Sequence, residues 1–510
     1  MTDQSITTAE VVSGPSASLD ARIVSGMRWT LWLSILSLPA SYGTAVLLAR
    51  VSPEAIGTFG LLSLYIALSS AFFFLGGPAV AIKFFPELSA DQRLALLVSY
   101  SLILVATTLP YQIAGSLWPS TLRLFLGTGA DTPFQVLILW LAPIYVAYSL
   151  VLAMLKAMME LKWAQFLTRI VTVGFFAICA ILFFAGRRLL AAYYTQFIWG
   201  VYLGLALLAT IVGIRRVWVL NSWKWPGSDI HFFLPRHFWP FTLGLQATSV
   251  LGFLSARLDY VFILNAGGLG VLGRYVALMT IVSAVSMLAT FILDSFLPSL
   301  TNTLAQGDID AARHTTEVYL RLMLPSGLAA ACLVLFFARP LVGLLGQRYQ
   351  SLVELVLIAV PFAAVQVLNW FTGILLSAIG QPHCEAIAKT FRTAVLCTSF
   401  WLLWGHFKLL GAVLAWALAE VSNQGVSLYL LTRKMPFRFS LFATYLPFLT
   451  MTFSAAAAAR LIGSHAFLLS SAAWLISMLC FGLMAKFTLS ETSWLIRLVL
   501  VRGSPLRHRP

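Results

Sequence analysis

Long apolar segments alternate with short polar segments along almost the whole chain. About 20 predominantly apolar residues are enough to carry an α-helix across the hydrocarbon core of a bilayer. Fourteen segments reach that length, and we predict a membrane-spanning helix in each. They lie near residues 27–49, 55–82, 94–117, 134–158, 163–185, 189–214, 237–264, 271–300, 319–338, 352–379, 386–407, 409–431, 441–462 and 466–487. The pattern therefore predicts an all-α polytopic membrane protein with about 14 transmembrane helices.

The amino-acid composition also limits the class of protein. Only 10% of the 510 residues are charged, and 60% are hydrophobic. A soluble domain carries about 25% charged residues, so this balance excludes a soluble enzyme, a fibrous chain and a disordered chain. The five cysteines include no CxxC pair, so we expect no disulfide framework, no metal site and no cofactor.

Lysine and arginine are distributed unequally between the two sides of the membrane. If both termini are cytoplasmic, 23 of the 33 Lys and Arg residues lie on the cytoplasmic side and nine lie outside, while Arg257 falls within a span. Cytoplasmic loops of membrane proteins are enriched in Lys and Arg, so this topology is the predicted one. Because the charges lie between apolar segments, the net charge of +15 indicates topology and not nucleic-acid binding.

The two halves of the chain carry the same landmarks at a nearly constant spacing. The matching pairs are Gly57-Thr58-Phe59 with Gly273-Arg274-Tyr275, Phe85-Pro86 with Phe296-Leu297-Pro298, and Pro143 with Pro361, at offsets of 216, 212 and 218 residues. A repeat of six helices is even, so both copies enter the membrane from the same side. Parallel repeats that rock around a central cavity are a recurring transporter design, and we predict a transporter.

The repeat also divides the chain into regions. We predict two parallel six-helix lobes followed by two further helices. The regions are a disordered cytoplasmic tail at 1–26, an N-lobe at 27–214, a cytoplasmic linker at 215–236, a C-lobe at 237–431, the two further helices within 432–487, and a basic cytoplasmic tail at 488–510.

The segment from Leu48 to Phe59 (LARVSPEAIGTF) resembles the end of helix 1 and the start of helix 2 in Wzx-type polysaccharide exporters. These are oligosaccharide flippases of the multidrug/oligosaccharidyl-lipid/polysaccharide (MOP) superfamily. The segment from Asp259 to Tyr275 is similar to the matching start of their second half. The resemblance implies a V-shaped protein of two six-helix lobes with two C-terminal helices, in the bacterial inner membrane.

The same resemblance implies a function. The protein would move an undecaprenyl-diphosphate-linked oligosaccharide from the cytoplasmic to the periplasmic leaflet, for surface polysaccharide biosynthesis. Its expected partners are this lipid, membrane lipids, and polymerase and export proteins of the same pathway, and it is expected to be a monomer. Related multidrug exporters commonly carry an acidic residue in helix 1, whereas residues 27–49 contain none, which favours the flippase over a cation-coupled drug exporter.

Ionisable side chains inside spans are the candidates for chemistry, because burying an isolated charge is costly. Arg257 and Asp259 lie in the seventh span. Arg257 is a candidate contact for the diphosphate or a sugar, and Asp259 for a sugar hydrogen bond or for a coupling proton or sodium ion. The alternative is a structural ion pair with another helix, or extension of the side chains to the outer interface.

Glu420 lies near the middle of the twelfth span, with Asn423 and Gln424 on the same helical face. It is a candidate coupling site for proton antiport. The alternative is an interhelical hydrogen bond that holds the C-lobe together.

Four arginines and one aspartate complete the candidates. Arg169, Arg392 and Asp294 lie towards the cytoplasmic side. The two arginines would either anchor their helices at the interface or form a basic inner vestibule, and Asp294 is a third coupling candidate. Arg50 and Arg274 flank the outer mouth, where they would receive the diphosphate or cap a turn.

Two other functions compete with flipping. One is a multidrug or small-molecule exporter coupled to a cation gradient. The other is a membrane-embedded glycan polymerase or transferase, although no paired carboxylates or histidine cluster indicate such chemistry. We therefore predict alternating access by two lobes, reset by a proton or sodium gradient.

Overall fold

The computed structural model describes residues 37, 39–85, 88–118, 132–158, 160–221, 232–305, 309–434, 441–462 and 467–484, and these are helical with short turns. Residues 39–51 form most of the first helix. The others are α2 (Pro53–Phe72), α3 (Pro78–Phe84), α4 (Ala90–Leu117), α6 (Thr132–Ala157), α7 (Leu161–Ala185), α8 (Arg187–Leu220), α9 (Phe238–Ala305), α10 (Ile309–Phe336), α11 (Ala338–Leu345), the 3-10 turn η2 (Gln347–Tyr349), α12 (Leu352–Ala378), α13 (Pro382–Lys434), α14 (Leu441–Ile462) and α15 (Phe467–Met484). The predicted all-α membrane fold is confirmed.

Two of these helices are helical hairpins, each with two segments that are long enough to cross a membrane. In α9 the chain reverses at Gly268, whose φ of 76° is outside the helical range, and Tyr275 then bonds back to Asp259. In α13 the reversal is at Lys408, with φ of 47°. Nine described helices are long and apolar enough to span a bilayer. Because two of them are hairpins, they provide eleven crossings.

The second span is broken, where a single helix over residues 55–82 was predicted. α2 ends at Phe72 and α3 begins at Pro78. Gly76 and Gly77 between them have φ of 72° and 64°, a left-handed conformation that glycine adopts without steric cost. Pro78 then occupies the first turn of α3, where no helical N–H is needed. The Gly-Gly-Pro sequence is the physical reason for the break.

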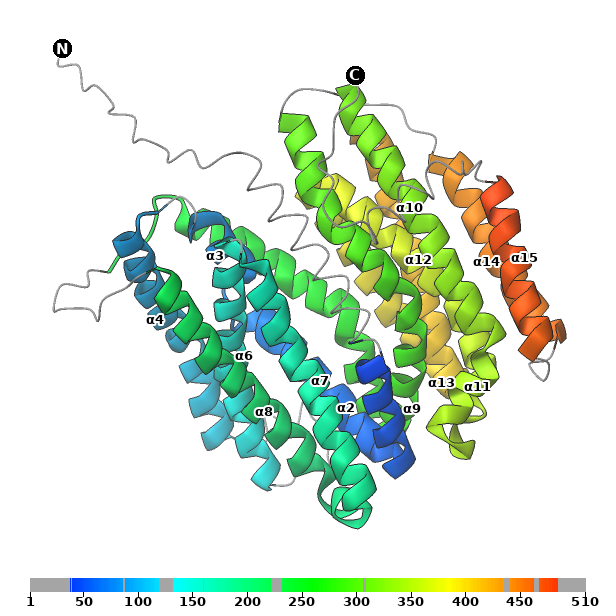
Figure 1. The fold of residues 1–510 in the computed structure, drawn as a ribbon, viewed down its shortest axis with the longest axis horizontal. Helices are drawn as coiled ribbons and strands as arrows, with labels where there is room; N and C mark the ends of the chain where they lie inside the picture. Colours follow the sequence, from blue (N-terminus) through cyan, green and yellow to red (C-terminus); the bar gives the residue numbers. More distant parts are fainter. Residues whose placement is uncertain are drawn as a thin grey trace.

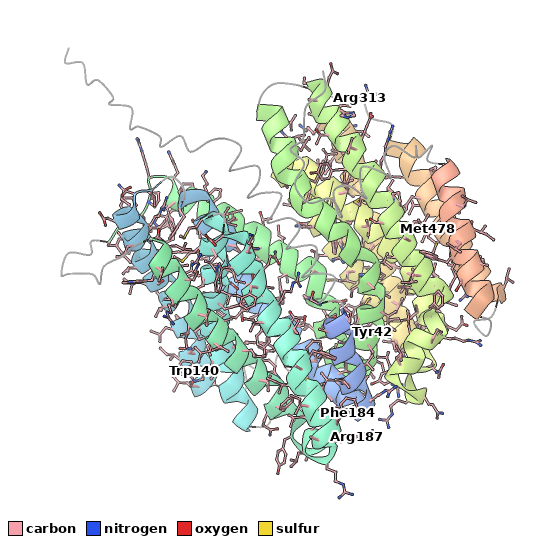
Figure 2. The ribbon with its side chains drawn as sticks, in the orientation of Figure 1. Tyr42, Trp140, Phe184, Arg187, Arg313 and Met478 are labelled. Atoms are coloured by element: carbon pink, nitrogen blue, oxygen red, sulfur yellow. The ribbon has the colours of Figure 1, made fainter. Side chains whose placement is uncertain are left out.

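The helices form two groups that are joined mainly by α2 and α9. Figure 1 shows α2, α3, α4, α6, α7 and α8 on one side and α10 to α15 on the other, with α14 and α15 at the far edge. The two groups approach each other at the end that the charge pattern predicts to be outside, called the outer end below, and diverge towards the other end (Figure 1). Large apolar side chains such as Trp140 and Phe184 point outward (Figure 2) and are 56% and 81% exposed, as lipid-facing residues are.

The first segment of α9, before Gly268, bridges the two groups. Phe238 at its start is buried in a cluster with Phe84 of α3 and Tyr100 of α4. Tyr260 and Leu264 near its end belong instead to the core that continues into α12 and α13. The same cluster includes Trp199 of α8, so the seventh span starts in a core of the first lobe and ends in a core to which both lobes contribute.

Candidate functional site

The lobes are joined at the outer end by hydrogen bonds to backbone carbonyls. Arg50 donates from Nε to the carbonyl of Leu344 over 2.8 Å, and Tyr42 donates to the carbonyl of Leu341 over 2.7 Å. Figure 2 shows Tyr42 between the two helix groups. Since Arg50 and Tyr42 precede α2 while both carbonyls belong to α11, these bonds close the outer end.

Glycines of the repeat make the same end tightly packed. A methyl group on Gly273 would collide with the carbonyl oxygen of Pro53, and one on Gly57 would collide with the carbonyl oxygen of Leu269. Gly57 and Gly273 are the repeat-related pair found in the sequence. Because neither has a side chain, α2 and the second segment of α9 approach with their backbones almost in contact.

The break between α2 and α3 is bridged by a side chain from α9. Gln246 accepts a hydrogen bond from the backbone N–H of Gly76 over 3.0 Å and donates to the carbonyl of Ala71 over 2.6 Å. A broken helix inside a membrane leaves backbone groups that must find other partners. Gln246 supplies them and so ties the first segment of α9 to the N-lobe.

A charged pair lies deep inside the second lobe. Arg392 donates from Nη2 to Glu420 Oε1 over 2.6 Å, and the two residues are only 6% and 1% exposed. The interpretation of Arg392 as an interface anchor is wrong, because its guanidinium is buried and ion-paired. The two residues lie on opposite sides of the turn at Lys408. The ion pair therefore joins the two segments of the α13 hairpin.

Amides from α12 complete the surroundings of Glu420. Gln366 donates to Oε1 over 3.2 Å and Asn369 donates to Oε2 over 2.7 Å. Thr372 donates to Gln424 over 3.4 Å. Glu420 and Gln424 therefore share a buried face, and both bond across to α12 as the interhelical alternative requires.

Asp259 lies beside this pair, also buried, at 5% exposure. Tyr275 donates to its Oδ2 over 2.6 Å, and the backbone N–H of Tyr260 donates to Oδ1 over 2.9 Å. Asp259 also interacts electrostatically with Arg257 and with Arg392. We call Asp259, Arg392 and Glu420 the buried charge cluster.

Arg257 does not join that cluster as an ion pair. Its guanidinium lies 5.0 Å from the ring centroid of Tyr260 and is half-buried. One helical turn earlier, Phe253 packs against Phe72 of α2 with ring centroids 5.7 Å apart. Residues four apart share a helix face, so Arg257 lies on the side of α9 that borders the N-lobe.

Lys83 is a second cation on this border. Its ammonium lies 4.4 Å from the ring centroid of Phe241, near the start of α9. Phe241 and Arg257 are 16 residues apart, or about 24 Å along a helix. Among the described residues, Lys83 and Arg257 each have aromatic partners but no carboxylate within ion-pair distance.

The remaining candidates lie apart from these groups. Arg169 interacts with Tyr148 inside the N-lobe. Arg274 is exposed at the outer end and interacts with Tyr349. Asp294 belongs to α9, but its side chain is outside the described part of the structure.

Several polar residues of the site were not among the predicted ones. They are Tyr275, Gln246, Gln366 and Asn369, which are uncharged, whereas the predicted candidates are all charged side chains. The sequence contains a signal for these four residues. Tyr275 belongs to the repeat landmark, and the three amides interrupt strongly apolar segments. Uncharged polar groups in a span require partners as carboxylates do.

Two helical lobes are joined at one end through α2 and α9, and solved structures of transporters share this fold. An inward-facing multidrug resistance MATE family transporter of the MOP superfamily aligns with a TM-score of 0.62 at 15% identity, over 81% of this chain and 98% of that chain. The lipid II flippase MurJ in an inward closed conformation aligns with a TM-score of 0.64 at 13% identity, over 90% and 98%. A MOP superfamily transporter from Pyrococcus furiosus, described as having a binding pocket of reverse polarity, aligns with a TM-score of 0.58 at 16% identity, over 86% and 96%.

These structural neighbours are MOP superfamily transporters, and at such low identity the likeness shows the fold. No protein-family model matches the sequence, and no curated protein sequence matches it. The Wzx-type resemblance therefore remains a prediction.

Proposed function

We propose that this protein moves an undecaprenyl-diphosphate-linked oligosaccharide from the cytoplasmic to the periplasmic leaflet of a bacterial inner membrane by alternating access. The observation that carries the proposal is the pair of cations at the border of α9 and the N-lobe. Among the described residues, Lys83 and Arg257 have no carboxylate within ion-pair distance. A cation in a membrane protein without an internal counter-ion is a candidate for binding an anionic substrate.

The fold supports this cargo. A lipid flippase is among the structural neighbours, and its alignment extends over 90% of this chain, against 81% for the inward-facing MATE transporter. Lys83 lies against Phe241, which precedes Arg257 on α9 by 16 residues. This spacing is about 24 Å along a helix, close to the thickness of the hydrocarbon core. A diphosphate that passes along this border would meet Lys83 near the cytoplasmic end and Arg257 in the outer half.

The closed outer end supports alternating access. Arg50 and Tyr42 join the lobes through single hydrogen bonds to backbone carbonyls, and each such bond contributes about 0.5–3 kcal/mol. These contacts are weak enough to break and reform during transport. Arg50 thus serves first as a closing contact, and its side chain becomes available to a diphosphate when the outer end opens.

Deletion and complementation test the proposal. A deletion strain should accumulate lipid-linked oligosaccharide in the cytoplasmic leaflet and lose the corresponding surface polysaccharide. The unaltered gene should restore both, whereas Arg257→Ala and Lys83→Ala should each reduce export by about tenfold, the loss expected for a hydrogen bond to a charged group. Arg433→Ala is the matched control, because Arg433 also lies over a tyrosine ring, 4.5 Å from that of Tyr429, but on α13.

Multidrug export is the second candidate, because MATE transporters also share the fold. The same strains distinguish the two functions. A deletion that leaves surface polysaccharide intact while increasing sensitivity to cationic drugs would support export and refute flipping.

A further inference from the structure

Three basic side chains lie where the last turn of α3 meets the start of α9. Lys83 lies over the ring of Phe241, and Arg236 and His237 immediately precede α9. All three basic residues are exposed. Among the described residues, none of them has a carboxylate within ion-pair distance. We call Lys83, Arg236 and His237 the inner basic cluster.

Aromatic packing holds α3 against the start of α9. Phe84, next to Lys83, contacts both Phe238 and Phe241 of α9, with ring centroids 6.1 and 5.6 Å apart. Phe238 is fully buried. Because His237 directly precedes Phe238, this packing also keeps the start of α9 close to Lys83.

The segment before α9 is held by two hydrogen bonds. The backbone N–H of Phe233 donates to the hydroxyl of Ser99 on α4 over 2.8 Å. The N–H of Phe238 donates to the carbonyl of Pro235 over 2.9 Å, which closes a turn around Arg236. A site whose side chains are already in place loses less free energy to ordering when a ligand binds. The inner basic cluster is therefore assembled before any ligand arrives.

Exposed aromatic side chains place this cluster at the level of the lipid headgroups. Phe232 and Trp239 lie on either side of it in the chain and are 65% and 46% exposed. Tryptophan is enriched at the membrane–water interface, where the phosphates of the cytoplasmic leaflet also lie. The two helix groups diverge towards this end (Figure 1). A lipid-linked cargo that enters between the lobes from the cytoplasmic leaflet therefore passes the cluster.

The cations of the cluster match the chemistry of a diphosphate. A diphosphate that links a lipid to a sugar carries a negative charge on each phosphate. Arginine binds phosphate oxygens through two parallel N–H groups, and an imidazole donates a further hydrogen bond. We propose that the inner basic cluster is a loading site, which binds the diphosphate of the cargo before it moves along the border to Arg257. This inference rests on the proposed function and adds Arg236 and His237 to the substrate contacts.

Lipid binding to the purified full-length protein tests the loading site. The probe is undecaprenyl diphosphate, and native mass spectrometry measures its affinity in competition with phosphatidylglycerol, which has one phosphate. The parent should bind the diphosphate about tenfold more tightly than phosphatidylglycerol. Arg236→Ala and Lys83→Ala should each reduce the affinity for the diphosphate by about tenfold, and His237→Ala by about threefold, since each removes a hydrogen bond to a charged group.

Arg215→Ala and Lys162→Ala are the matched controls. Both cations are exposed at the same end of the N-lobe, on α8 and α7, and neither belongs to the cluster, so both variants should bind the diphosphate as the parent does. Arg236→Lys keeps the positive charge and should retain most of the affinity. This variant separates the loss of a phosphate contact from a loss of folding.

Three results would overturn the loading site. They are an affinity that Arg236→Ala leaves unchanged, equal binding of phosphatidylglycerol and the diphosphate by the parent, and an equal loss of affinity in the two control variants. The proposed function fails on a different observation, because it requires loss of export in the deletion strain and in Arg257→Ala. Normal export in those strains would refute flipping whatever lipid the cluster binds.

Discussion

An arginine in the interior of the C-lobe and an arginine at the border between the lobes have different interaction partners. Arg392 is buried, pairs with Glu420 over 2.6 Å and lies among amides from α12. Arg257, on the border, stacks on Tyr260 and has no ion-pair partner in the described ranges. A cation that already has its counter-ion contributes to the structure of one lobe, whereas a cation without one is available to a substrate.

Arg392→Ala should have the largest effect and should act on folding. It leaves Glu420 buried without its counter-ion, which costs about 3–5 kcal/mol. Thermal unfolding of the purified protein in detergent measures the loss. The double variant Arg392→Met with Glu420→Leu removes both charges and should recover most of the stability. Equal stability of Arg392→Ala and the parent protein would show that the ion pair does not stabilise the C-lobe.

Gly273→Ala should act on the border and not on either lobe. The added methyl group meets the carbonyl oxygen of Pro53, and relieving such overpacking costs about 1–3 kcal/mol. The cost should appear as a larger population with an open outer end, measured as the distance between spin labels at Arg188 on α8 and Gln347 on η2, which are both exposed. Gly252→Ala is the control, since a methyl group there meets no atom within 4 Å.

Gln246→Ala should have a smaller effect, of about 1–2 kcal/mol, because it leaves the N–H of Gly76 and the carbonyl of Ala71 without their side-chain partner. Hydrogen exchange of the backbone around the break between α2 and α3 should become faster. Thr248→Ala, two residues away and bonded only within its own helix to Gly244, should leave that exchange unchanged.

Arg257→Ala should change stability least, by about 1 kcal/mol, since the half-buried side chain contributes a cation–π contact with Tyr260 and an electrostatic interaction with Asp259 but no ion pair. Unfolding of this variant should match the parent closely even though its export falls. The opposite pattern, a destabilised protein that still exports, would show that Arg257 is structural.

Local pattern predicted most of the architecture and part of the candidate site. Span positions followed from apolar segment length, and the shared face of Glu420 and Gln424 followed from helical spacing. The break after Phe72 was missed because a hydropathy pattern does not register backbone angles, although Gly76, Gly77 and Pro78 are the residues that a break uses. Position within the span favoured an interface anchor for Arg392, because it lies towards the cytoplasmic side, and periodicity along one helix does not show the carboxylate of Glu420 that pairs with it.

The sequence by itself determined the helical membrane class, which follows from the lengths of the apolar segments, and it predicted the repeat from landmarks 212 to 218 residues apart. Only the tertiary structure decided which charges meet. Arg392 and Glu420 are 28 residues apart and Asp259 is more than 130 residues from either, so their proximity depends on how two hairpins pack. Gly57 and Gly273 are equivalent landmarks of the repeat in the sequence, and the packing of α2 against α9 brings these two glycines into contact. Pairing across helices is a property of three-dimensional packing, and periodicity along one chain cannot specify it.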